Sequence, residues 1–209
     1  MSLPKELTQA IENARDAMLR YPQHDIGAGY RHTIWAALGP RADSPQETKS
    51  IGLKRRATLA ILSTQHVLPL WERARPGDTT PQHILAEAER ALNKAVDKQK
   101  VWKDRNRYWV QFNDLINENE KNDVIASVGF AAVQALTAAL QDERFDPDRI
   151  DIHLTDFDID VEELDASFFA AAAYAHGPIW APQSSAAKRR EFWEWWLKDA
   201  VPSVWNAIS

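Results

Sequence analysis

The 209-residue sequence contains no cysteine, which excludes disulfide bonds, thiolate zinc sites and cysteine nucleophiles. Glycine is rare, with 7 residues, and this argues against a sheet-rich fold and against a glycine-rich phosphate-binding loop. No segment approaches the roughly 20 apolar residues that a membrane span needs, so we expect no membrane partner. The amino-terminal sequence has no apolar run of signal-peptide length, and we expect a cytoplasmic protein.

Helical periodicity fills most of the chain. Breaks at Tyr21-Pro22 and Gly39-Pro40 separate the first helices, and Pro69 is expected to kink or break the third. No repeat or linker divides the sequence. We therefore predict one all-α domain over residues 1–209, an orthogonal or bundle-like arrangement of helices with one acidic loop. The predicted helices cover residues 7–18, 29–38, 53–74, 81–96, 101–115, 123–136, 167–174 and 185–198.

Negative charge is concentrated in residues 142–166, which we call the acidic segment. It holds eleven acidic residues against two arginines, a net charge of −9, so the rest of the chain carries +4 although the whole chain carries −5. Ile150, Ile152 and Leu154 alternate with polar residues, but no second alternating run exists to pair with them. We therefore expect an extended loop rather than a strand.

Two basic triplets, Lys54-Arg55-Arg56 and Lys188-Arg189-Arg190, lie near predicted helix starts, where the helix dipole disfavours cations. Two interpretations stay open. Solvent screens these long side chains, or Arg55 or Arg189 reaches the acidic segment and ties it to the helical body. The second would relieve the repulsion among the carboxylates.

The acidic segment resembles a calcium loop only in part. Asp156, Asp158 and Asp160 have the spacing of the first three ligands. Val161 replaces the required glycine, and Ser167 replaces the closing glutamate. We predict no metal and no cofactor, and interpret these acids as solvated or capping groups. The alternative is a helical metal-dependent hydrolase that uses the carboxylates of residues 156–160.

No catalytic constellation is evident. The sequence has no HExxH, GxSxG or Walker motif, and its six histidines lack ligand spacing. Ser63 and His66 are one helical turn apart, but no orienting acid or oxyanion hole is indicated. We therefore predict no catalytic residue and no enzyme. The acidic balance and the lack of a helix-turn-helix also disfavour a third interpretation, a DNA-binding regulator that uses the basic triplets, so we expect no nucleic-acid partner.

The carboxyl end is rich in tryptophan. On a helix, Phe192, Trp193, Trp196 and Leu197 cover an arc of roughly 140°, and Trp195 widens it to about 200°. Such an arc is too wide for one neighbouring helix. Either the helix lies in a groove between several elements, or one tryptophan stays at the surface, with Trp195 as a candidate interface anchor.

Three segments resemble the fifth family of immunity proteins from bacterial polymorphic toxin systems. They are Gly29-Tyr30-Arg31 with the residues to Gly39, the stretch from Lys54 to Trp71, and the block KRREFWEWWL at 188–197. The alanine-rich run from Asp165 to Gly177 and Trp180 also resembles that family. The match spans most of the chain in the expected order.

The resemblance implies an α-helical protein without catalytic residues that binds a cognate toxin protein and blocks it by occluding its active site. A nuclease is one candidate toxin, because nucleases are commonly basic and the acidic segment would fit a phosphate-binding cleft. We predict that five acidic residues of the acidic segment and one tryptophan bind the partner: Asp156, Asp158, Asp160, Glu162, Glu163 and Trp195.

Overall fold

The computed structural model describes residues 2–41, 50–94, 96–119 and 122–208, and in these ranges every regular element is helical. This confirms the predicted all-α class. The α-helices are α1 (Lys5–Arg20), α2 (Ala28–Ala37), α3 (Ile51–Ala74), α4 (Thr80–Asn93), α5 (Lys98–Glu118), α6 (Asp123–Gln141), α7 (Ala166–Tyr174), α8 (Ala186–Trp195) and α9 (Val201–Ala207).

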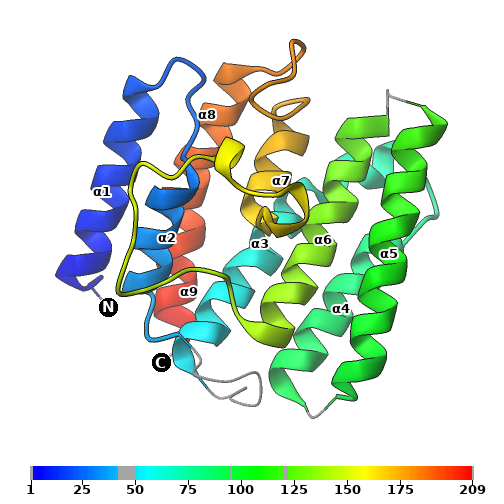
Figure 1. Ribbon diagram of the computed structural model, residues 1–209, viewed down its shortest axis with the longest axis horizontal. Coiled ribbons are helices and arrows are strands. Elements are labelled where there is room, and N and C mark those ends of the chain that lie inside the picture. The colour runs from blue at the N-terminus through cyan, green and yellow to red at the C-terminus, as the bar shows by residue number, and fades with distance from the viewer. Residues whose placement is uncertain (1, 42–49, 95, 120–121, 209) are drawn as a thin grey trace.

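Helix α6 is the centre of the fold. It packs against α3, α4, α5 and α7 (Figure 1), and alanines along its length let these neighbours approach closely. In length and composition α6 could cross a membrane, so the expectation that no segment approaches such a span was wrong. Most of the helix is buried inside the protein, as in the core helix of a soluble domain.

One proline lies inside α3, and another follows the π-helical turn near the carboxyl end. Helix α3 continues through Pro69 to Ala74, so the proline does not break it. The last helix does not end at Lys198 either, because a π-helical turn, η4 (Trp196–Ala200), leads directly into α9. Pro202 lies in the first turn of α9, where a missing N–H loses no hydrogen bond within that helix.

Helix α7 has defined caps at both ends. The side chain of Asp165 accepts hydrogen bonds from the backbone N–H groups of Ser167 and Phe168, the geometry of an N-cap. At the other end, His176 rather than Gly177 follows the C-cap in the left-handed region, with φ of 63°. Gly177 comes next at φ of 144°.

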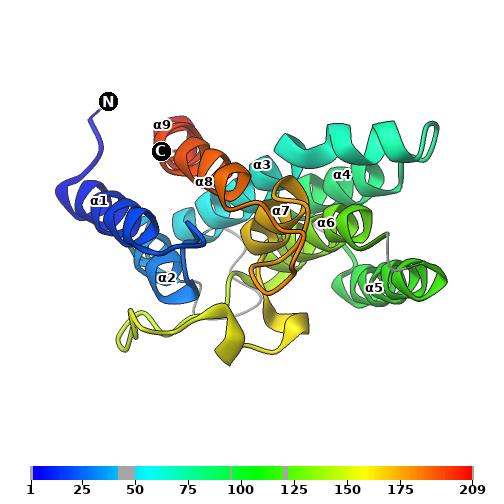
Figure 2. The same ribbon diagram turned by 90° about the horizontal axis from the view of Figure 1, so that it is seen from above.

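The aromatic carboxyl end lies in a groove between several elements. Phe192, Trp193, Trp196 and Leu197 are all buried in one hydrophobic core that extends from Leu7 to Val204. The acidic segment forms the connection between α6 and α7 and contains two 3₁₀ turns, η2 (Asp156–Asp158) and η3 (Val161–Glu163). It contains no strand, as expected, and covers one face of the molecule (Figures 1 and 2).

Close packing of α6 on α5 generates a test of the fold. A Cβ atom added at Gly129 would lie 2.6 Å from Cγ of the fully buried Phe112. Alanine normally stabilises a helix relative to glycine by about 1 kcal/mol. Here we expect Gly129→Ala to lower the free energy of unfolding by about 1–3 kcal/mol, because the core is overpacked. Urea denaturation measures the change.

Phe112→Leu in the Gly129→Ala background supplies the control. The smaller side chain gives the new methyl group room, so the double variant should lose less stability than the two single losses added together. An increase in stability for Gly129→Ala alone would contradict the packing of these helices.

Candidate functional site

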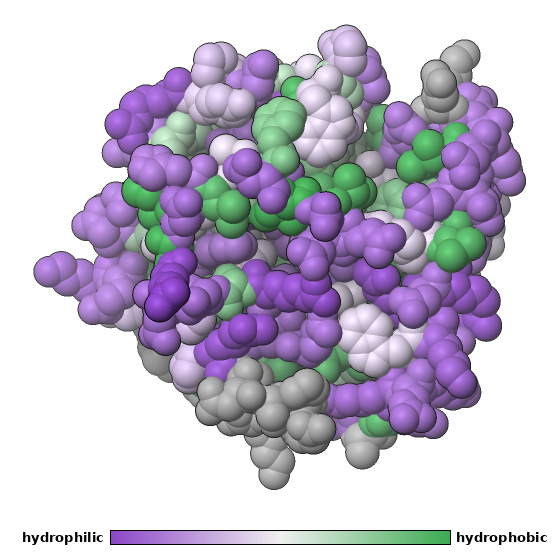
Figure 3. Space-filling view, viewed as in Figure 1, coloured by the Kyte–Doolittle hydropathy of each residue, from purple (hydrophilic) through white to green (hydrophobic). Residues whose placement is uncertain are grey.

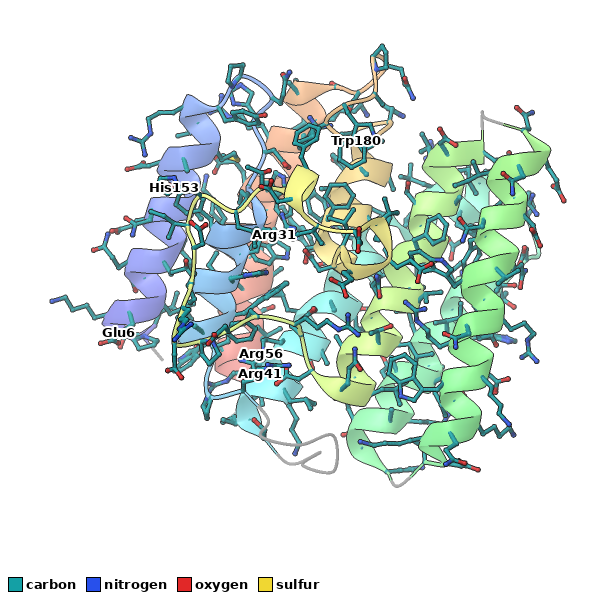
Figure 4. The ribbon with its side chains drawn as sticks, in the orientation of Figure 1. Glu6, Arg31, Arg41, Arg56, His153 and Trp180 are labelled. Carbon is teal, nitrogen blue, oxygen red and sulfur yellow. The ribbon has the colours of Figure 1, made fainter. Side chains whose placement is uncertain are left out.

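The buried guanidinium of Arg31 anchors the acidic segment to α2. One terminal nitrogen lies 2.5 Å from Oδ1 of Asp156 and 2.7 Å from Oδ2 of Asp165, and the other donates to the carbonyl of Ile26. Burial disfavours the charged guanidinium, but the carboxylates of Asp156 and Asp165 outweigh burial and raise the pKa of Arg31. Figure 4 shows Arg31 beside the acidic segment. This one cation holds two separate points of that segment.

A second buried pair holds the start of the acidic segment. Nε and a terminal nitrogen of Arg56 each donate to a carboxylate oxygen of Asp142 at 2.7 Å, in the bidentate geometry that suits arginine. The remaining donors reach the carbonyls of Trp35, Gly39 and Pro40. Arg56 thus joins α3 to the end of α2 and to the first residue of the acidic segment.

Of the two open interpretations, the one in which Arg55 or Arg189 ties the acidic segment to the helical body named the wrong arginines. Arg55 donates to the carbonyls of Leu38 and Ile208 and stacks on the ring of Trp205 at 3.6 Å. Arg189 donates to the carbonyls of Gln23 and Gly177. These carbonyl acceptors stabilise both cations inside the helical body, and the ties to the acidic segment come from Arg31 and Arg56 instead.

The backbone of the acidic segment also packs directly on α2. The N–H of Gly29 donates to the carbonyl of Leu154 at 3.0 Å. A Cβ atom at Gly29 would lie 2.7 Å from the carbonyl carbon of Ile152 and would collide with the carbonyl oxygen of Asp151. Only glycine permits this approach, so the first turn of α2 is a docking surface for residues 151–154.

The predicted partner-binding acids divide into one buried and four exposed residues. Asp156 is 2% exposed and its carboxylate is paired with Arg31, so it is not one of the acids on the open surface of the segment. Asp158, Asp160, Glu162 and Glu163 face solvent. That these four bind a partner stays a prediction.

Two of the four exposed acids also have partners within the acidic segment. Asp158 accepts hydrogen bonds from the hydroxyl and the backbone N–H of Thr155, and these bonds lower the pKa of Asp158. Glu163 pairs with Arg144. The local geometry of the exposed turns is therefore fixed in part by the acids themselves.

A cavity of about 700 Å³ lies between the acidic segment and helices α2, α5 and α6. Asp160, Glu162 and Glu163 line it together with Arg105 and Arg144, so its walls carry charges of both signs beside apolar side chains. Two further titratable groups in its lining have shifted pKa values. Burial lowers the pKa of His32 to about 4, and burial together with Asp165 and Asp142 raises the pKa of Glu143 well above its usual range.

Exposed apolar side chains gather beside these acids. We call Tyr21, Ile152, Phe157 and Trp180 the apolar patch. Three of them line one pocket, and the rings of Phe157 and Trp180 are 5.4 Å apart. Phe157 is 62% exposed, and the patch holds four of the six exposed large hydrophobic side chains among the described residues. Hydrophobic residues cross the upper half of this face in Figure 3.

Sequence reasoning missed the apolar patch. The available signal was Phe157 itself, a large aromatic residue between Asp156 and Asp158 with no helical stripe to join. Trp180 entered the sequence argument only through the family resemblance. An exposed hydrophobic cluster rimmed by charged groups is typical of a protein-binding surface.

Trp195 lies apart from this surface. Its ring stacks on His66 at a centroid distance of 3.7 Å and an interplanar angle of 12°, and it is half-buried. Burial lowers the pKa of His66, which favours the neutral ring. In Figure 2, α8 and α9 lie on the opposite side of α2 from the acidic segment. The structure therefore does not bring Trp195 together with the exposed acids.

Among the residues that the structure describes, we looked for a metal-binding cluster and for a serine–histidine pair. No group of three or more His, Asp or Glu side chains among them could hold a metal ion. Ser63 bonds to the carbonyl of Leu59, to Ser167 and to Trp196, while His66 stacks on Trp195. The two residues of the conceivable dyad thus face different partners.

A model of the family described as immunity protein Imm5 matches residues 11–203. The chain belongs to the Imm5 family. This match confirms the resemblance drawn from the sequence motifs. The family consists of immunity proteins, so family membership indicates immunity to a toxin and does not say which toxin. No curated protein matches the chain significantly. Membership of Imm5 indicates a binding protein for a toxin partner and suggests an inhibitor rather than an enzyme.

A buried carboxyl beside the Arg31 cluster provides a test of the site's electrostatics. Asp25 accepts a hydrogen bond from the indole N–H of Trp193 at 2.7 Å. Burial and the nearby carboxylate of Asp156 raise the pKa of Asp25 to about 6. The folded state therefore holds this proton more tightly than the unfolded state, and this carboxyl stabilises the fold increasingly as the pH falls through 6.

Asp25→Asn removes the carboxyl that is charged at pH 7 and largely protonated at pH 5. We therefore expect the variant to gain stability relative to the parent protein when the pH rises from 5 to 7. The difference in unfolding free energy between variant and parent should be larger at pH 7 by about 1 kcal/mol, since one pKa unit corresponds to about 1.4 kcal/mol. Urea denaturation of both proteins at the two pH values measures this difference. A difference that does not change with pH would contradict the environment of Asp25.

The docking of the acidic segment on α2 gives a second test. Gly29→Ala should displace residues 151–154 because the new methyl group collides with their backbone. We expect limited proteolysis within the acidic segment to become at least about tenfold faster, while far-ultraviolet circular dichroism stays helical.

Gly27→Ala is the matched control. Its added Cβ would lie 3.4 Å from the carbonyl oxygen of Leu154, an ordinary contact. Equal protection of the acidic segment in both variants would mean that the close approach at Gly29 is unimportant for docking.

Proposed function

We propose that this protein neutralises a cognate bacterial toxin in the cytoplasm by binding it with the face that carries the acidic segment and the apolar patch. The bound immunity protein covers the active site of the toxin. A polymorphic toxin system supplies the setting, since producing cells and their neighbours need protection from a toxin that they encounter.

One observation carries this proposal: buried arginines hold an exposed apolar patch in place beside exposed carboxylates. Protein interfaces combine a few aromatic anchors with a polar rim, and this face has both components. Three buried ion pairs and a backbone contact fix the acidic segment before any partner arrives. Binding therefore loses less conformational entropy than it would with an unanchored loop.

The charge of the acidic segment indicates the chemistry of the toxin. Its exposed carboxylates attract a basic surface and accelerate encounter with it. A nuclease fits this requirement because its active site is built to hold phosphate groups. The carboxylates of Asp158, Asp160 and Glu162 would then occupy the positions that a nucleic-acid substrate would take.

The hydrolase alternative has no observation in its favour. Both carboxylate oxygens of Asp156 bond to Arg31, which leaves this residue poorly suited to bind a metal. The remaining acids at 158 and 160 are exposed.

Charge reversal tests the electrostatic part of the proposal. The toxin is taken as the carboxyl-terminal domain of the protein encoded directly upstream. We expect Asp158→Lys/Asp160→Lys/Glu162→Lys to lower the association rate by about tenfold or more at low salt, because steering is lost. Stopped-flow or surface plasmon resonance measures the rate, and co-expression measures protection from the toxin.

Glu89→Lys/Asp114→Lys/Glu118→Lys is the matched control. It changes the net charge equally at exposed positions of α4 and α5. Equal effects of the two triple variants would show that net charge alone, rather than the acidic segment, governs association.

Truncation of the patch tests the anchoring part. Phe157→Ala should raise the dissociation constant by about 30-fold, since an interface anchor typically contributes 2 kcal/mol or more. Val110→Ala removes a side chain of similar exposure, 56%, from α5 and should leave binding unchanged. An unchanged dissociation constant for Phe157→Ala would remove the apolar patch from the interface.

A further inference from the structure

A small pocket of about 210 Å³ opens at the apolar patch. Tyr21, Tyr30, Phe157 and Ile179 supply aromatic and apolar walls. Two carboxylates, those of Asp25 and Asp156, also line the pocket, and both are buried while Tyr21 and Phe157 are exposed. The pocket therefore combines an open aromatic rim with an acidic floor.

Negative charge exceeds positive charge around this floor. The buried groups are three aspartates, Asp25, Asp156 and Asp165, and two arginines, Arg31 and Arg189. Arg31 bonds to Asp156 and Asp165. Asp25 is attracted by Arg31, which is already engaged by the other two aspartates, and by Arg189, whose Nε is 3.9 Å away and whose terminal nitrogens donate to carbonyls. Asp25 is thus the most weakly compensated carboxylate of the set.

We propose that the pocket receives one cationic side chain, a lysine or an arginine, of the bound toxin. The alkyl stem of that side chain packs between the rings of Tyr21, Tyr30 and Phe157, and its charged end faces Asp25. This inference rests on the proposed function and specifies how the interface selects its partner.

The chemistry of the pocket favours a cation over other occupants. Aromatic faces attract cations, and the attraction is stronger where water is excluded. A purely apolar side chain would remove the remaining water from Asp25 without supplying a counter-charge, which is unfavourable. An anion would add a further negative charge next to two carboxylates.

The groups around Asp25 also determine how binding depends on pH. It faces Asp156 of the acidic segment, Arg31 of α2, and Arg189 and Trp193 of α8, and Tyr21 lies at the end of α1. Both arginines stay charged over the accessible range. Because the pKa of Asp25 is raised to about 6, its negative charge, and with it the attraction for a cation, is lost as the pH falls below 6.

Titration of the intact protein with butylguanidinium tests the pocket without any toxin. Nuclear magnetic resonance follows the indole N–H of Trp193, which donates to Asp25. We expect a saturable shift at pH 7.5 that weakens at least threefold at pH 5. Neutral butylurea, of the same shape, should give no saturable shift.

Two variants locate the effect. Asp25→Asn keeps an acceptor for Trp193 but removes the charge, and Tyr21→Ala removes an exposed wall. Each should weaken butylguanidinium binding at least tenfold, while Val110→Ala on α5 should not change it. Equal shifts with butylurea, no saturable shift with butylguanidinium, or unchanged binding in Asp25→Asn would overturn the proposal.

The toxin complex separates this inference from the proposed function. If the toxin binds the parent protein, and Phe157→Ala weakens the complex while Asp25→Asn and Tyr21→Ala do not, the proposed interface stands and the cation pocket is wrong. If the parent protein does not bind the toxin, the proposed function fails. The butylguanidinium titration then decides separately whether the pocket prefers a cation.

Discussion

The burial of two arginines against aspartates of the acidic segment is the constraint on which the rest of the structure depends. Arg31 and Arg56 come from helices of the body, and their carboxylate partners, Asp142, Asp156 and Asp165, come from the beginning, middle and end of the connection between α6 and α7. Taking such charges out of water is costly, and only near-complete hydrogen bonding offsets the cost. The arginines therefore fix one path for a segment that would otherwise be extended by its own repulsion. Loss of either partner would leave a buried charge without compensation.

This arrangement separates the acids into two roles. Buried aspartates compensate the arginines, while the exposed acids of the 3₁₀ turns remain available to a partner. The same path brings Ile152 and Phe157 to the surface next to Tyr21 and Trp180. The charge that makes the segment attractive to a basic protein thus also supplies the ion pairs that hold its apolar anchors in position.

The helices could be predicted from the sequence because their apolar stripes repeat at a local spacing, as Leu7 to Met18 in α1 show. Stops at Pro22 and caps such as Asp165 are equally local signals. The partners of Arg31 and Arg56 could not be predicted, because they lie 86 to 134 residues away and depend on how the helices pack. Arg55 and Arg56 are neighbours in sequence, yet Arg55 reaches Ile208 at the carboxyl end and Arg56 reaches Asp142 at the start of the acidic segment. Asp156 looked like a surface acid for the same reason. Its burial depends on tertiary contacts, and its sequence neighbourhood, with many other acids, does not distinguish it from the exposed carboxylates.

The start of α1 and helix α9 lie on the side of the molecule away from the acidic segment (Figure 2). Arg55 also fastens the carboxyl end to α3 through the carbonyl of Ile208 and the ring of Trp205. Either end can therefore be attached to a bead, a sensor chip or a fluorescent reporter while the acidic face stays open to solution. For a chain of this size, that geometry permits capture experiments in a defined orientation without an engineered linker across the candidate interface.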